Sequence, residues 1–203
     1  MKNLILTAIL SIGLWAQGAA NCDPGVYLKG FGGVNFIGGS SMYPEVKTGY
    51  VVGGCVGYKF NSPVRLEAEI SYRDNQVGKS SSEVNFGSET KYILPVEFGY
   101  INSWTGTGNF LWDIPLGKVT PFLGAGVGYQ VAFSSLQFGP DANGRLYVSS
   151  VEGRTITPVC QAIGGINFQF FKKTDMRTDY RYVRGVVDSL GNHTLAFTLM
   201  QSF

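Results

Sequence analysis

Charged residues at every second position, in two separate segments, are the feature of this chain that could do chemistry. The first series is Arg65, Glu67, Glu69 and Arg73, and the second is Asp175, Arg177, Asp179 and Arg181. Successive side chains of a β-strand point to opposite faces, so each series would lie on a single face of a strand. Charges confined to an interior must pair, because an unpaired buried ion is very costly. The spacing therefore predicts a network of ion pairs, which either fills an interior or lines a narrow path for ions.

The elements that must position these charges are predicted to be strands in hairpin order. Alternating apolar and polar or small residues occur in eight stretches, namely residues 26–36, 49–60, 64–74, 90–101, 118–133, 156–170, 174–184 and 193–203. The short connections are 61–63 and 172–173, the longer ones on the other side are 37–48, 74–89, 134–154 and 184–192, and the long connection 102–117 is an exception. This pattern predicts an all-β fold: an eight-stranded antiparallel up-and-down transmembrane β-barrel with short periplasmic turns and longer extracellular loops.

Aromatic residues near the ends of these stretches indicate that the barrel crosses a membrane. They share parity with the apolar face and form two belts, an inner one with Tyr58, Tyr100, Phe168 and Phe203 and an outer one with Phe36, Tyr72, Tyr129 and Tyr180. Amphipathic rings are enriched at both membrane interfaces. A soluble β-sandwich also alternates, but it has no reason to finish its strands in this way. We therefore expect an integral, multi-pass β-barrel surrounded by outer membrane lipid.

The first twenty residues are predicted to be a cleaved signal peptide. Lys2 provides the positive charge, and the small residues Gly18-Ala19-Ala20 offer a cleavage site. The apolar run from Leu4 to Trp15 is too short to span a bilayer as a helix, which needs about 20 residues. Residues 21–203 would then form the outer membrane β-barrel domain.

Polar residues occupy the alternate strand positions that are predicted to point into the barrel. Besides the two charged series, they include Lys29, Lys91, Glu97, Gln161, Asn167 and Gln169. An eight-stranded barrel has room inside for side chains but not for a wide water column. We expect three glutamates to face two arginines and to plug the lumen; the glutamates are Glu67, Glu69 and Glu97, and the arginines are Arg177 and Arg181. A narrow gated ion path is the alternative.

Other kinds of site find little support in the sequence. His193 is the sole histidine, and although Asp188 and Ser189 are close to it, nothing fixes the three in the geometry that catalysis requires. One histidine and scattered acids do not make a metal-ligand set, and we expect no cofactor. The alternating glycines of residues 124–128 are predicted to make room for long charged side chains opposite, because they lack the following helix of a phosphate cradle.

Charge and cysteine content limit the partners further. The chain has 16 Lys and Arg against 14 Asp and Glu, a net charge of +2, whereas a nucleic-acid-binding domain would be strongly basic. Its three cysteines are Cys22, Cys55 and Cys160, so complete internal pairing is impossible. We expect Cys55 and Cys160 to be small strand residues, with a free thiol or a bridge to another molecule as the alternative.

Four of the predicted strands carry motifs that point to a known family. They are TPFLGAGVGY at 120–129, RLEAEISYR at 65–73, YRY at 180–182 and HTLAFTLMQSF at 193–203. These resemble the fifth, third, seventh and eighth strands of the small OmpA-type barrels and bacterial surface antigens, the outer membrane protein β-barrel family. The resemblance covers nearly all of residues 21–203. It implies an eight-stranded barrel in a Gram-negative outer membrane, often with a surface-antigen, adhesion or envelope-integrity role.

The resemblance also implies a second role for the last strand. In this family the outer membrane assembly machinery reads a terminal aromatic strand, and the matching positions here are Leu195, Phe197, Leu199 and Phe203. Gln201 departs from the pattern, which usually has an aromatic or apolar residue at that place. Recognition would then be weaker or tuned to a particular host.

The predicted external loops are the expected places of contact with other molecules. Their apolar candidates are Phe86, Phe138, Leu146 and Tyr147, which either anchor ligands or fold back on the barrel rim. We expect a non-enzymatic, monomeric surface barrel with a plugged lumen, acting in adhesion, in binding host or environmental ligands, or in envelope integrity. A small, porin-like channel of low conductance is the alternative, and a lipid-modifying enzyme is a further one.

Overall fold

The strands of this chain form a sheet that closes on itself. The structure is a computed structural model that describes residues 24–38, 46–78, 80–85, 91–117, 119–138, 150–171, 174–186 and 191–203. The strands are β1 (Gly25–Gly38), β2 (Gly49–Lys59), β3 (Val64–Val77), β4 (Ser80–Asn85), β5 (Lys91–Asp113), β6 (Val119–Phe138), β7 (Ser150–Phe171), β8 (Thr174–Gly185) and β9 (Gly191–Ser202). Among the described residues, no helix is long and apolar enough to span a bilayer.

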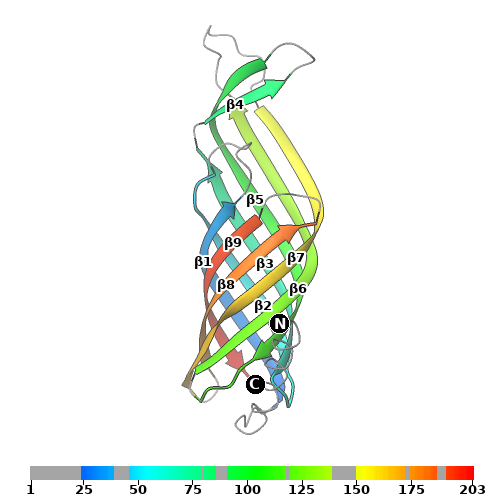
Figure 1. The fold of residues 1–203 in the computed structure, drawn as a ribbon, viewed down its shortest axis with the longest axis vertical. Helices are drawn as coiled ribbons and strands as arrows, with labels where there is room; N and C mark the ends of the chain where they lie inside the picture. The colour runs from blue at the N-terminus through cyan, green and yellow to red at the C-terminus, as the bar shows by residue number, and fades with distance from the viewer. Residues whose placement is uncertain are drawn as a thin grey trace, which may run out of the picture.

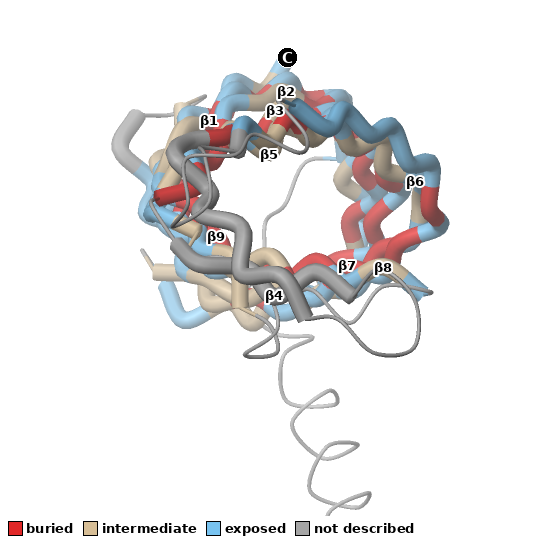
Figure 2. The backbone as a smooth tube through the Cα atoms, turned by 90° about the horizontal axis from the view of Figure 1, so that it is seen from above, coloured by how far each residue is buried: buried red, intermediate tan, exposed pale blue. Residues whose placement is uncertain are grey.

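Pairing between β3 and β5 closes the barrel. The sheet order is β3-β2-β1-β9-β8-β7-β6-β5-β4, and β3 pairs along β5 as well, so eight strands form the ring in Figure 2. All neighbouring strands are antiparallel. The short β4 pairs with the first part of β5 beyond the end of β3 (Figure 1). The predicted eight-stranded antiparallel up-and-down barrel is confirmed.

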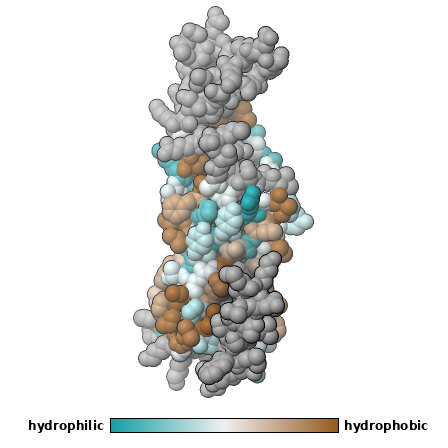
Figure 3. Space-filling view, in the orientation of Figure 1, coloured by the Kyte–Doolittle hydropathy of each residue, from teal (hydrophilic) through white to brown (hydrophobic). Residues whose placement is uncertain are grey.

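Alternation along each strand puts polar side chains inside and large apolar ones outside. On β3, Leu66 and Ile70 are 47% and 58% exposed, whereas Glu67 between them is 3% exposed. Figure 3 shows apolar side chains over much of the described part of one outer face of the barrel. This is the reverse of a soluble protein, and it suits a wall that separates lipid from a polar interior.

The tight connections lie at the end of the barrel that holds Phe203. The backbone N–H of Phe203 donates to the carbonyl of Val26 at 3.2 Å, next to the start of β1. The turn between β5 and β6 places Gly117 at a φ of +76°, a conformation that favours glycine. At this end four residues separate β2 from β3, and two separate β7 from β8. This is the split between short and long connections that the sequence predicted.

The long connection predicted at residues 102–117 is wrong, because β5 continues to Asp113. Gly106 and Gly108 interrupt the apolar alternation here, which hid the strand in the sequence. Both face outward, and a Cβ atom on either would meet nothing within 4 Å. The inner-belt place predicted for Tyr100 is wrong for the same reason, because the inner end of β5 carries Phe110 and Trp112 instead.

The wall is taller on one side than on the other. Strands β5, β6 and β7 have 23, 20 and 22 residues, whereas β2, β8 and β9 have 11, 12 and 12. A strand crosses a membrane in about 9–11 residues. The ends of β5, β6 and β7, together with β4, therefore project beyond the shorter strands (Figure 1).

The projecting strands shorten two of the predicted external loops. The segment 74–89 contains the end of β3 and all of β4, and the segment 134–154 is reduced to the eleven residues between β6 and β7. Strand β8 pairs with β7 only from Val159 onward. Residues 150–157 of β7 thus have no strand partner on that side within the described part of the chain.

Candidate functional site: the charged lumen

Strands β3 and β8 supply most of the lumen charges from opposite sides of the barrel. Three strands separate them in either direction around the ring. Their buried charged side chains are Arg65, Glu67, Glu69 and Arg73 on β3 and Arg177, Asp179 and Arg181 on β8. Direct contact between these two rows must therefore cross the full width of the lumen.

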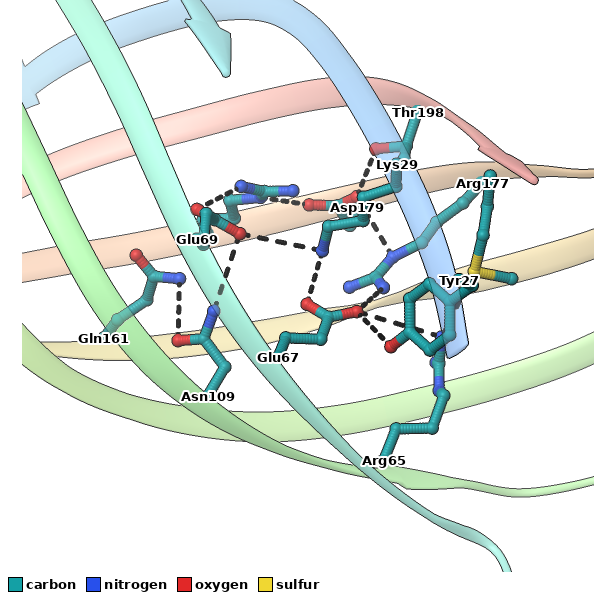
Figure 4. Close-up of polar contacts among 12 residues, drawn as sticks. Tyr27, Lys29, Arg65, Glu67, Glu69, Asn109, Gln161, Arg177, Asp179 and Thr198 are labelled. Atoms are coloured by element: carbon teal, nitrogen blue, oxygen red, sulfur yellow. Dashed lines mark hydrogen bonds and ion pairs between the residues drawn. The ribbon is translucent and has the colours of Figure 1, made fainter. Parts of the chain in front are cut away.

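Two glutamates make that crossing. Glu67 accepts a hydrogen bond from Arg177 Nη1 at 3.3 Å (Figure 4). Glu69 accepts one from Arg181 Nη1 at 2.7 Å. Lys29 on β1 forms an ion pair with Glu67, and its Nζ lies 3.6 Å from Glu69 Oε2. Each carboxylate thus meets at least two cations, which is the arrangement that compensates buried charge.

Asp179 connects the arginines of its own strand. Its Oδ1 lies 3.2 Å from Arg177 Nε, and its Oδ2 pairs with Arg181 Nε. The hydroxyl of Thr198 on β9 donates to Asp179 at 3.1 Å. The alternating Arg-Asp-Arg series therefore pairs along β8 as well as across the lumen.

The inner end of the lumen has its own ion pair. Arg65 Nη2 lies 2.5 Å from Asp113 Oδ1 on β5, and the Tyr27 hydroxyl donates to Glu67 at 2.8 Å. Asp175 is half-buried at this end and makes no ion pair within the described part of the chain. The network thus continues from the inner end to the middle of the barrel.

Aromatic rings complete the packing around the arginines. The Arg177 guanidinium lies 3.6 Å from the ring centroid of Phe122, and that of Arg181 lies 3.8 Å from the centroid of Phe31. Both rings are buried inside the barrel. Cation–π contacts of this kind strengthen where water is excluded.

Small residues on β2 let side chains from β1 and β3 meet above them. A Cβ atom on Gly57 would lie 2.3 Å from Tyr27 Cζ, and one on Gly49 would lie 2.6 Å from Asn75 Nδ2. Because these positions lack a side chain, Tyr27 reaches Glu67 from one side of β2 to the other. Asn75 reaches Asn35 in the same way.

The inward glycines of β6 have a different neighbour from the one predicted. A Cβ atom on Gly124 would lie 2.2 Å from Leu111 Cδ2, and one on Gly126 would lie 1.9 Å from Asn109 Oδ1. Leu111 and Asn109 belong to the adjacent strand β5. The glycines therefore accommodate that strand's side chains, and the expectation of charged groups opposite is wrong.

Toward the outer end, amides and hydroxyls replace the charges. Asn35 Nδ2 donates to Asn75 Oδ1 at 2.7 Å, and the Thr194 hydroxyl donates to Asn35 Oδ1 at 2.9 Å. Arg73 lies between this layer and the ion pairs, where its Nη1 donates to the hydroxyls of Thr105 at 2.8 Å and Ser71 at 3.1 Å.

Several lumen residues were not predicted from the sequence. Asp113 and Asn109 lie in the part of β5 that was taken for a connection, although they alternate with Phe110 and Trp112 and could have been found by that period. Other missed residues are Tyr27, Phe31 and Phe122, which share parity with inward residues of their strands.

Gln161 and Asn167 are buried as expected. Gln169, predicted to point inward, is exposed beside a register shift at the end of β7.

Some predicted residues lie outside the described residues. The backbones of Lys91, Glu97 and Phe138 are described, but their side chains are not. The other predictions in this group are the signal peptide of residues 1–20 and the residues Cys22, Phe86, Leu146, Tyr147, Asp188 and Ser189.

The outer surface carries the remaining candidates. Leu195, Phe197, Leu199 and Phe203 are all exposed on the lipid-facing side of β9. His193 also faces outward, with its Nδ1 2.5 Å from the Tyr180 hydroxyl. Cys55 is buried in the lumen, Cys160 is exposed on the outer wall, and both are free thiols.

A comparison with family models gives a match that includes the whole barrel. The model described as outer membrane protein beta-barrel domain matches residues 4–203. The chain belongs to this family. A curated relative from Gluconacetobacter diazotrophicus, named "Outer membrane protein", is 36% identical over 96 residues, which cover 44% of this chain but only 23% of the relative.

One solved structure supports the likeness in fold, and a second is given beside it. The crystal structure of Neisserial surface protein A has a TM-score of 0.57 at 15% identity, covering 88% of this chain and 97% of that one. The crystal structure of Ail from Yersinia pestis has a TM-score of 0.49 at 12% identity, covering 89% and 98%. The predicted family resemblance is confirmed, and the protein is an integral β-barrel of the outer membrane.

Proposed function

We propose that this outer membrane barrel is a non-enzymatic surface protein whose lumen is plugged by its ion network. The observation that carries the proposal is the pairing of Glu67 with Arg177 and of Glu69 with Arg181 between opposite strands. Removing one partner of a buried ion pair typically costs about 3–5 kcal/mol. A path for ions along the axis would have to break such pairs repeatedly, so the closed state is favoured.

Single-channel recording in planar bilayers tests the plug. The wild-type barrel should remain closed or open rarely, whereas Glu67→Gln and Arg177→Gln should open more often because each loosens a crossing pair. Glu152→Gln, on the exposed end of β7, is the matched control and should open as rarely as the wild type. Frequent, stable openings of the wild type that shift in the two lumen variants would instead establish the low-conductance channel.

The projecting sheet supports a role outside the membrane. Strands β4 to β7 extend beyond the shorter wall, and residues 150–156 of β7 are exposed on both faces. Loops and sheet ends held on a rigid barrel are suited to contact with ligands. We therefore place adhesion, ligand binding or envelope bracing at this end, with Phe86, Phe138, Leu146 and Tyr147 as the candidate contacts.

Binding to host-cell surfaces and serum proteins tests the external role. Replacing residues 139–149 by a short turn should reduce binding, while a variant carrying the same residues in shuffled order keeps the length and serves as control. If both variants bind as the wild type does, this loop is not the contact. If neither they nor the wild type binds, envelope bracing is favoured over adhesion.

The absence of enzymatic activity is part of the proposal and has its own test. On the outer wall, His193 Nδ1 lies 2.5 Å from the Tyr180 hydroxyl, and its ring centroid lies 4.9 Å from that of Tyr182. A general base must reach a nucleophile, and among the described residues His193 forms no hydrogen bond with a serine, threonine or cysteine side chain. His193→Ala should therefore leave lipid A unchanged in mass spectra, and a loss of modified lipid A would support an enzyme.

We also propose that the outer membrane assembly machinery recognises the outward-facing residues at the end of the chain, Leu195, Phe197, Leu199 and Phe203. Deletion of Phe203 should lower the amount of heat-modifiable barrel in outer membrane fractions, whereas Gln201→Phe should raise or maintain it. Normal insertion of the Phe203 deletion would remove the signal and leave only a membrane-facing strand.

A further inference from the structure

The projecting end of β7 has one edge without a strand partner among the described residues. Residues 150–157 pair with β6 on one side, whereas β8 ends at Gly185, which pairs with Val159. Residues 150–156 are exposed throughout, and β7 forms one margin of the projecting sheet in Figure 1. An edge of this kind presents N–H and C=O groups that can pair with another strand.

Every second residue of this segment directs its backbone groups to the open edge. The carbonyl of Pro158 accepts a hydrogen bond from the N–H of Val186 at 2.9 Å, so residue 158 faces the side of β8. Alternate residues of an antiparallel ladder bond to opposite sides, and the pairing of β7 with β6 is continuous from Ser150 to Val159. The open edge therefore presents the backbone groups of residues 150, 152, 154 and 156. Pro158 ends the row of donors, because proline has no N–H.

Two charges on this segment select its partner. Glu152 and Arg154 flank Gly153, and both side chains are exposed. A second copy of the segment, paired antiparallel and centred on Gly153, places Glu152 opposite Arg154 of the copy, and Arg154 opposite Glu152 of the copy. Opposite charges directly across a ladder stabilise it, and like charges destabilise it. Moving the centre by one residue to either side puts two like charges opposite each other.

The same register satisfies the backbone. Residues 152 and 154 both direct their backbone groups to the open edge, and so do residues 150 and 156, which form the next pair. The two strands can then exchange about eight hydrogen bonds, two in each of four residue pairs. Ile156, which is 59% exposed, comes to lie beside the second copy of the strand. The charges and the backbone thus favour one and the same register.

The direction of β7 decides where the second copy stands. The strand runs from the outer end of the barrel to the inner end, where two residues separate it from β8. Two barrels in one membrane share this direction, so their edges cannot run antiparallel, and parallel edges would bring Glu152 beside Glu152. An antiparallel partner is inverted, as a barrel in the membrane of a facing cell is. The short strands β8 and β9 end below the open edge, so the partner meets a low rim there (Figure 1).

We propose that the open edge of β7 joins two copies of this protein in facing outer membranes, by antiparallel pairing of residues 150–156. The inference rests on the adhesive role proposed above and names a second copy of the chain as its partner. A single pair of strands is only marginally stable in water, but many pairs between two membranes act together. The barrel thereby holds cells that carry it to one another, and it remains a monomer within its own membrane.

Aggregation of phospholipid vesicles that carry the full barrel, followed by turbidity, tests the pairing. Wild-type vesicles should aggregate. Glu152→Arg and Arg154→Glu should each weaken a pair by about tenfold or more and abolish aggregation, because each puts like charges opposite each other at two places. Lys47→Glu, which changes an exposed charge away from this edge, is the control and should aggregate as the wild type does. Heat-modifiable gel mobility verifies that each variant is folded.

Mixing the two charge variants tests the register itself. Vesicles with Glu152→Arg and vesicles with Arg154→Glu should join one another although neither aggregates alone, because the mixed pair sets arginine opposite glutamate at both places. Fluorescence cross-correlation between two dyes, one for each kind of vesicle, measures this joining. Lys47→Glu makes the same change in net charge as Arg154→Glu, and its vesicles should join those with Glu152→Arg far less.

A proline variant separates strand pairing from the attraction of charges. Ile156→Pro removes an N–H from the open edge and no hydrogen bond to β6, so aggregation should be lost. Ile156→Thr keeps this N–H and a β-branched side chain, and its vesicles should aggregate.

Four results would overturn the proposal. They are dispersed wild-type vesicles, aggregation that survives Glu152→Arg, aggregation that survives Ile156→Pro, and charge variants that stay apart when they are mixed. Binding of the wild type to host surfaces or serum proteins without vesicle aggregation would refute the pairing of copies and leave the external role standing. Aggregation without such binding would support the pairing and limit the external role to contact between copies.

Discussion

The inner half of the lumen is held by charges, and the outer half is held by amides and hydroxyls. In the inner half, Glu67 and Glu69 reach arginines on the opposite strand β8. In the outer half, Asn35 bonds to Asn75 and Thr194, on strands no more than two places away around the ring. Long side chains of opposite charge can span the barrel, whereas short amides join near neighbours. The two halves therefore stabilise the barrel in different ways, one across it and one around it.

Breaking the charged half should have the largest effect. Glu67→Leu leaves Lys29 and Arg177 buried without their shared carboxylate, and we expect a loss of about 3–5 kcal/mol in the free energy of unfolding. Denaturant unfolding in lipid vesicles, followed by tryptophan fluorescence, measures it. Glu152→Leu on the exposed end of β7 should cost little. A loss below about 1 kcal/mol for Glu67→Leu, the value typical of an exposed pair, would show that the crossing pairs are not structural.

A double-mutant cycle should separate crossing from neighbouring contacts. Glu69→Gln and Arg181→Gln should couple by about 1–3 kcal/mol, because the two groups touch at 2.7 Å in a buried lumen. The same cycle on Asn35→Ala and Asn75→Ala should give a smaller coupling of about 0.5–1 kcal/mol. Equal couplings would contradict the distinction between the halves.

Filling the space over β2 should cost an intermediate amount. Gly57→Val places carbon atoms where the Tyr27 ring lies, so we expect a loss of about 1–3 kcal/mol through displacement of that ring and of its bond to Glu67. Gly106→Val is the control, because its outward Cβ would meet nothing within 4 Å. If both variants unfold alike, close packing over β2 is not what limits this position.

The outer half should show the smallest loss. Asn75→Ala removes the 2.7 Å bond to Asn35, but Asn35 Nδ2 also lies 3.3 Å from Asn192 Oδ1 and can use that acceptor. We expect a loss of about 1 kcal/mol in the same unfolding assay. Asn61→Ala in the exposed turn after β2 should have no measurable effect. A loss as large as that of Glu67→Leu would place the outer layer among the main supports of the barrel.

The sequence predicts which residues face the lumen wherever apolar and polar residues alternate cleanly. Residues 65–73 and 175–181 do so, and their parity is the one found in the structure. Strand β5 does not, because Gly106 and Gly108 remove the apolar partners of its inward threonines. Asp113 and Asn109 lie in the part of β5 that was predicted to be a connection, so they were not predicted to face the lumen.

Contacts between lumen residues are harder to predict than their direction. Strand count alone places β3 opposite β8, so facing charges could be anticipated. Which atoms meet depends on the stagger between strands and on gaps such as Gly57, and neither follows from periodicity. The bonding of Arg73 to hydroxyls follows only from the finished set of contacts, because its sequence neighbours alternate in the same way as those of Glu67.

The uneven height of the wall gives the protein a direction in the plane of the membrane. A neighbour approaching along the surface from the side of β5, β6 and β7 meets an upright sheet, whereas one approaching from the side of β9 and β1 meets a low rim. Access to the upper lumen, and crowding by surface sugars, must then differ from one side to the other. Rotation of the barrel about its axis, which would be invisible for an even-walled cylinder, changes what this protein presents to its surroundings.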